Sequence, residues 1–135
     1  MINKPWKFIL HLLAVTMEID EHTHNKEYTA MFDFLDEWIP GDDHREKNIN
    51  FSIELANAYE LMGETYEQKE AYVSSLMANP LLEQKGVINN IKKGLKIVIE
   101  ADGVMHPSEK KLFQFILDSI EAKNYSIRDQ IEDIF

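Results

Sequence analysis

One spacing of acidic residues and histidine, Asp-x-x-x-His-x-x-Glu, occurs twice in the chain, 82 residues apart. The two copies comprise Asp20, His24, Glu27, Asp102, His106 and Glu109. Glu18 and Glu100 each stand two residues before the Asp of their copy. Over the 24 aligned positions 13–36 and 95–118, seven residues coincide, against roughly one or two expected from average usage. Duplicated acidic segments indicate a cation site.

Carboxylates drawn together at partly buried helix ends repel one another, and a divalent cation supplies the neutralising charge. We therefore expect a divalent metal ion bound by Asp20, Glu27, Asp102 and Glu109, with His24, His106, Glu18 and Glu100 as further ligands. Oxygen ligands alone favour Ca²⁺ or Mg²⁺, whereas histidine shifts the preference toward Zn²⁺, Mn²⁺ or iron. The sequence does not select among these ions.

The same acidic residues also suit helix ends without a metal. Glu27 and Glu109 follow their histidines by three positions, the spacing of a capping box, and Pro107 is placed as the first residue of a helix. Asp102 and Gly103 form a good tight turn. Capping and metal binding therefore remain alternatives for these carboxylates.

The elements that must position these residues are helices. Apolar residues recur at helical spacing almost everywhere, and no segment shows sustained alternation, so we expect an all-α fold of about seven helices. The expected helices lie near residues 5–19, 25–39, 44–62, 66–78, 81–101, 112–120 and 126–134. The repeat predicts two related halves, with copies at about 5–39 and 81–122.

The first helix is apolar on most sides, which predicts that it is central. The fifth helix occupies the same place in the second repeat, which predicts that it is the other central helix. If successive helices alternate in direction, these two point the same way and the acidic segments that follow them share one end of the molecule. For the third helix, the inward candidates are Ile49, Ile53, Ala56 and Met62. His11 and His44 are interpreted as ordinary helix residues.

Bulk composition bounds the function. The length of 135 residues suits a single domain spanning 1–135, and the formal charge of -10 disfavours nucleic acid as a partner. The absence of cysteine excludes disulfides and thiolate sites and is typical of a reducing compartment, so we expect a cytoplasmic protein. No stretch reaches the roughly 18 apolar residues of a membrane span, so direct membrane insertion is not expected.

With this organisation in view, the segment from Ile99 to Glu109, IEADGVMHPSE, resembles the bacterial tellurite-resistance TerB family. The Ala-Asp-Gly at 101–103 and the Glu seven residues after the Asp carry the likeness; the first copy keeps Asp20 and Glu27 of that pattern. The resemblance implies an all-helical domain with two related halves whose paired acidic motifs form a metal-binding surface. It also implies a role in stress response.

We therefore expect a non-enzymatic, TerB-like domain that binds a divalent cation in a metal or envelope-stress response of the tellurite-resistance type. The alternative is an acidic protein-interaction module that binds no metal. For that alternative, the candidate contact residues are the aromatics Trp38, Tyr59, Tyr66 and Tyr125. A metal-assisted hydrolase is the least favoured interpretation, because no nucleophile or oxyanion-binding motif accompanies the carboxylates.

Overall fold

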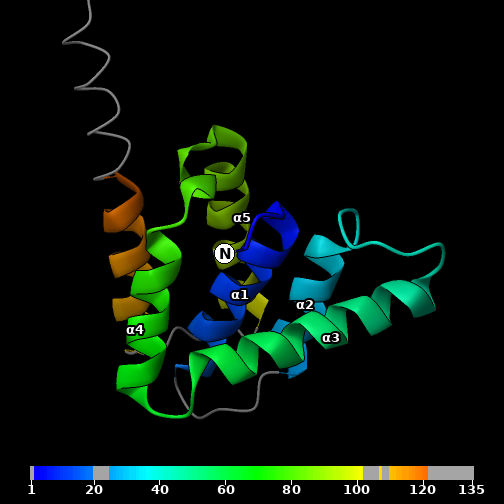
Figure 1. The fold of residues 1–135 in the computed structure, drawn as a ribbon, viewed down its shortest axis with the longest axis horizontal. Coiled ribbons are helices and arrows are strands. Elements are labelled where there is room, and N and C mark those ends of the chain that lie inside the picture. The colour runs from blue at the N-terminus through cyan, green and yellow to red at the C-terminus, as the bar shows by residue number, and fades with distance from the viewer. Residues whose placement is uncertain (1, 20–24, 102–106, 108–109, 122–135) are drawn as a thin grey trace, which may run out of the picture.

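The computed structural model describes residues 2–19, 25–101, 107 and 110–121, and it contains no strand within those ranges (Figure 1). The elements are α1 (Pro5–Glu18), α2 (Asn25–Leu35), α3 (His44–Met62), α4 (Tyr66–Met77), the 3₁₀ helix η1 (Pro80–Glu83) and α5 (Lys85–Ala101). Residues 110–121 are also helical. The predicted all-α class is confirmed for this part of the chain, and the helix expected near 126–134 lies outside it.

Helix α1 is the centre of the fold. It begins at Pro5, whose fixed φ suits the first helical position, and every residue from Phe8 to Met17 is buried. Figure 1 shows the other helices arranged around it. A helix that is apolar on all sides is stable only when other elements cover each side. The burial of α1 therefore confirms the central position predicted for it from the sequence.

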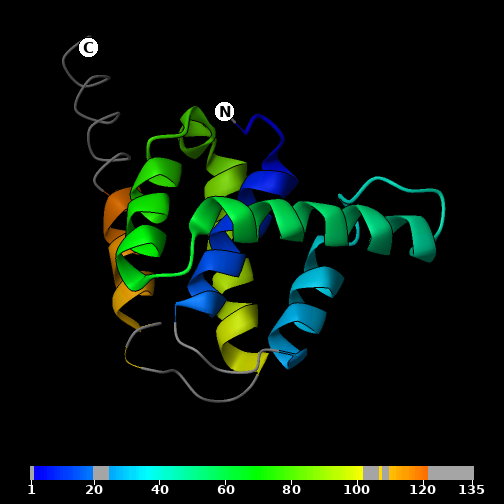
Figure 2. The same ribbon diagram turned by 60° about the horizontal axis from the view of Figure 1, so that its bottom comes forward.

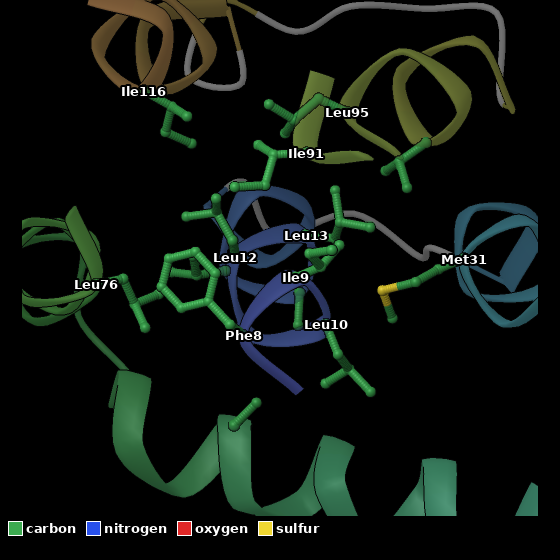
Figure 3. Packing of buried hydrophobic residues seen from close by; sticks show 14 of the residues in the cluster. Phe8, Ile9, Leu10, Leu12, Leu13, Met31, Leu76, Ile91, Leu95 and Ile116 are labelled. Carbon is green, nitrogen blue, oxygen red and sulfur yellow. The ribbon is translucent and has the colours of Figure 1, made fainter. Parts of the chain in front are cut away.

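Helix α5 packs along α1 and α2, and Figure 2 shows α1 and α5 running in the same direction. Leu12 and Leu13 of α1 meet Ile91 and Leu95 of α5 in the core (Figure 3). Gly94 permits the close approach, because a Cβ added there would lie 3.0 Å from side-chain atoms of both Leu13 and Phe34. The predicted parallel direction of the two helices is confirmed, but α5 is not central, because it buries one side and exposes the other.

Helix α3 lies across α1 (Figure 2), and the inward face predicted for it is wrong. The residues that it buries are Phe51, Glu54, Ala58 and Met62. Of the four candidates, only Met62 is buried, while Ile49 and Ile53 are 49% and 56% exposed and Ala56 is also exposed. At 100° per residue these three lie on the side of α3 opposite to Phe51.

Two helix boundaries also differ from the predictions. Helix α2 ends at Leu35 instead of Ile39. The helix expected from residue 81 begins at Lys85, because Asn79 caps the separate turn η1 by accepting from the Leu81 backbone N–H and Gln84 is extended.

The start of α3 is fixed by Asp43, whose side chain accepts a hydrogen bond of 2.8 Å from the Glu46 backbone N–H. A capping box of Thr65 and Gln68 starts α4.

None of the helices in the described part of the chain combines the length and apolar character that a transmembrane helix needs.

Candidate functional site

The end of the molecule at which α1 and α5 finish and α2 begins is called here the acidic end; its described carboxylates are Glu18, Glu27 and Glu100. Figure 2 shows these three helix termini on the same side. A shallow hollow is lined by residues of α2 from Asn25 to Asp33 and by Ala101 at the end of α5. The helices that lead into the two motif copies therefore finish next to the same helix start.

Five of the eight predicted metal ligands, Asp20, His24, Asp102, His106 and Glu109, lie outside the described residues. Within the described residues, no three His, Asp or Glu side chains are grouped closely enough to hold one metal ion. The predicted metal site therefore stays a prediction, and the geometry available for it is that of Glu18, Glu27 and Glu100.

Glu27 lies in the first turn of α2 and is only 1% exposed. A carboxylate at this position complements the positive end of the helix dipole. Because a charged carboxylate is costly to bury, its burial requires compensating interactions at the acidic end, which both capping and metal binding supply. Glu100, near the end of α5, is exposed to solvent.

Glu18 is half-buried at the end of α1 and is held from two sides. The Tyr28 hydroxyl donates to Glu18 Oε1, and the Tyr59 hydroxyl donates in turn to Tyr28. Burial, together with the hydrogen bond to Glu18, raises the pKa of Tyr28, so the phenol stays protonated and remains a donor. Lys69 Nζ donates to the Glu18 backbone oxygen at 2.8 Å, where it satisfies a terminal carbonyl of α1.

A second group of polar side chains, which the sequence analysis does not identify, lies at the edge of the core, with two members buried and two partly exposed. This buried polar cluster consists of Lys7, His11, Glu54 and Tyr72. His11 is 1% exposed; its Nδ1 lies 2.6 Å from Tyr72 Oη and its Nε2 lies 2.7 Å from Glu54 Oε1. Lys7 Nζ is 3.5 Å from Glu54 Oε2. The cluster thus joins α1, α3 and α4 through side-chain contacts.

The protonation of this cluster follows from burial and hydrogen bonding. Burial lowers the pKa of His11 below 6.5 against the opposing effect of Glu54, so the ring is neutral at pH 7. Burial tends to raise the pKa of Glu54, but the hydrogen bond from His11 and the charge of Lys7 bring it below its usual value.

Burial and the Glu54 charge raise the pKa of Tyr72 to about 12. The Tyr72 hydroxyl therefore donates to His11 Nδ1, and His11 Nε2–H donates to Glu54.

The signal for this cluster was present in the sequence. His11 interrupts the otherwise apolar run from Phe8 to Val15, and a polar ring within a helix that is buried on all sides needs a hydrogen-bonding partner from another element. Glu54 is not identifiable as that partner from the sequence, because the apolar residues of α3 predict the opposite inward face.

No family model, curated protein or solved structure matches this chain.

Proposed function

We propose that the protein binds a divalent cation at the acidic end through Asp20, Glu27, Asp102 and Glu109, with Glu18, Glu100, His24 and His106 as further ligands. The observation that carries the proposal is the parallel packing of α1 and α5, which brings the helices preceding both motif copies to the start of α2 (Figure 2). Buried Glu27 adds a carboxylate at the same place. The number of histidines among the ligands would decide between Ca²⁺ or Mg²⁺ and Zn²⁺ or Mn²⁺.

We further propose that the domain is TerB-like, with two related halves, and that it acts without catalysis in a metal or envelope-stress response in the cytoplasm. Support comes from the order of elements. Helix α1 precedes one motif copy and is followed by the amphipathic α2. Helix α5 precedes the other copy and is followed by the helical residues 110–121.

Thermal unfolding tests the metal proposal. Protein treated with EDTA and dialysed is heated alone and with added Ca²⁺, Mg²⁺, Zn²⁺ or Mn²⁺. A ligand that binds only the folded form at a hundredfold excess over its Kd stabilises it by about 2.7 kcal/mol. For a domain of this size that corresponds to a rise in Tm of roughly 10 °C. If none of the four ions raises the Tm, the metal proposal is wrong.

A double variant at the motif and a control variant outside it assign the effect to the motif. Asp20→Asn combined with Asp102→Asn should remove most of the ion-dependent rise in Tm. Asp42→Asn, at an exposed position in the turn before α3, changes one carboxylate in the same way and should leave the rise unchanged. A rise that persists in the double variant would place the ion elsewhere.

The alternative proposal is an acidic interaction module without metal. Trp38 and Tyr59 are each 39% exposed, but they contact opposite ends of α2, at Phe34 and Tyr28. Tyr66 packs against the core, and Tyr125 lies outside the described residues. Because Glu27 is buried, the suitable charge reversal is Glu100→Lys. If this variant no longer binds a basic partner protein, and if chelator does not change the Tm of the unmodified chain, the interaction module is favoured.

A further inference from the structure

A cavity of about 730 Å³ lies between the start of α1, the second half of α3 and the end of α4. Its polar wall includes Lys7, Glu54 and Tyr72 of the buried polar cluster, and its apolar wall includes Ile2, Leu61 and Leu76. Pockets that hold small molecules in proteins typically measure about 300–1,000 Å³ and combine an apolar lining with a few polar groups. The cavity has both properties.

The hydrogen bonds of the cluster leave acceptors facing this cavity. The Tyr72 proton is directed to His11, so the remaining capacity of the Tyr72 oxygen is that of an acceptor. Glu54 accepts from His11 through Oε1, while Oε2 lies 3.5 Å from Lys7. A charge-assisted N–H···O bond is about 2.7–2.9 Å long, so the Lys7 contact is loose and leaves room for a closer donor.

One electrostatic feature of the cavity favours a cation, although the start of α1, which also borders the cavity, carries the positive end of a helix dipole. The last turn of α4 borders the cavity at Ser75 and Leu76 and contains no basic residue to complement the negative end of the helix dipole. The whole chain carries a formal charge of -10. Lys7 is itself an ammonium group beside Glu54, and its side chain is 35% exposed, so it can turn into solvent when a second ammonium group takes its place at the buried carboxylate.

General acid–base catalysis is a poor fit to the same groups. His11 has both nitrogens engaged and is almost completely buried, so it does not reach a substrate in the cavity. The pKa of Tyr72 is raised to about 12, so at pH 7 the phenol is protonated and is not a base. The arrangement therefore suits binding.

We propose that the cavity binds a small primary amine in its ammonium form, which donates to Glu54 in place of Lys7, has Tyr72 Oη as a neighbouring acceptor, and packs its apolar body against Ile2, Leu61 and Leu76. This site is separate from the acidic end. Lys7 and Glu18 are eleven residues apart on α1, about 16 Å along the helix axis. The amine proposal does not rest on the metal proposal.

Isothermal titration of the full chain with hexylammonium chloride, in buffer containing EDTA, tests the inference without interference from metals. Hexanol presents the same apolar body without charge, and sodium hexanoate presents it with the opposite charge. Saturable binding of hexylammonium, at least tenfold tighter than that of either control, is expected. Equal binding of hexanol would show that the cavity recognises only the apolar body, and tighter binding of hexanoate would show that it prefers anions. Either result overturns the proposal. The absence of hexylammonium binding also overturns it.

Two variants locate the binding site. Glu54→Gln removes the charge but keeps an acceptor for His11, and it should weaken hexylammonium binding tenfold or more, the effect of losing one hydrogen bond to a charged group. Lys7→Met removes the competing ammonium and should tighten binding several-fold. Lys92→Met, on the exposed side of α5, changes the net charge equally and should leave the affinity unaltered. Weaker binding in Lys7→Met overturns the proposal, and this variant decides the matter even if Glu54→Gln does not fold.

Discussion

The hydrogen bond between His11 and Glu54 is the most informative contact to perturb, because it joins α1 to α3 inside the core at 2.7 Å. We consider three variants: His11→Leu, Glu54→Leu, and both together. Glu54→Leu leaves His11 Nε2–H without its acceptor, and His11→Leu leaves Glu54 with Lys7 alone. The double change removes donor and acceptor together and puts apolar side chains of moderate size in their place.

The expected magnitudes follow from burial. A hydrogen bond to a charged group contributes about 1.5–3 kcal/mol, and a buried polar group left without its partner costs about 1–3 kcal/mol. His11 is 1% exposed, so Glu54→Leu leaves the Nε2–H without an acceptor and without access to water. We expect each single variant to lose about 2–4 kcal/mol. The double variant should lose about 1.5–3 kcal/mol less than the two single losses added together.

Urea denaturation at pH 7.5, followed by circular dichroism at 222 nm and by tryptophan fluorescence, measures the four free energies of unfolding. A domain of this kind is stable by about 5–15 kcal/mol, so the single variants should remain folded. Equal urea dependence in all four proteins would show that the same surface is exposed on unfolding. If the two losses add to within about 0.5 kcal/mol, His11 and Glu54 do not interact and the geometry of the cluster is refuted.

Three further predictions concern His11, a pair of glycines in α5, and Asp43. Burial lowers the pKa of His11, so the unfolded chain takes up this proton first as the pH falls below 6.5. The free energy of unfolding should therefore decrease between pH 7.5 and 5.5, and it should decrease less in His11→Leu. An equal decrease in that variant would contradict the lowered pKa of His11. A Cβ added at Gly86 meets no atom within 4 Å, so Gly86→Ala should raise the free energy of unfolding by about 0.4–1 kcal/mol. Gly94→Ala should be less stable than Gly86→Ala by about 1–3 kcal/mol, because its Cβ crowds neighbouring side chains. Equal Tm values for the two variants would show that the contact of α5 with α1 is loose. Asp43→Ala should cost about 1 kcal/mol in urea denaturation through loss of the cap of α3, while no loss would mean that the cap contributes nothing.

Much of the fold was predictable because its signals are local. Asp43 before α3, Gly63 after it and Thr65 before α4 mark helix ends by hydrogen bonding and backbone geometry that depend on a few neighbouring residues. The burial of α1 was equally clear from its almost uninterrupted apolar residues. These features need no knowledge of the rest of the molecule.

The face of α3 was not predictable in the same way. Ile49 and Ile53 suggest one inward side, but the helix buries Glu54 with Phe51 on the other. Glu54 belongs inside only because His11 and Lys7, more than forty residues earlier, supply its partners. Hydrophobicity assigned residue by residue cannot anticipate a buried pair formed between distant segments.

For the predicted metal site, the structure bears on one premise only. The parallel direction of α1 and α5 followed from counting helix reversals, and the structure confirms it. The ligand set extends beyond the described residues, so it remains a prediction that rests on the duplicated motif and on the position of Glu27.

The central position of α1 has a consequence for how the chain reaches its native state. This helix leaves the ribosome before α2 to α5, and the residues of α5 that cover one of its sides follow about eighty positions later. Until they emerge, the nascent chain carries an apolar helix with one side in contact with water, so the native arrangement forms only when the distant segment arrives. A fragment that stops after α4 would keep this side of α1 open, and self-association would compete with folding.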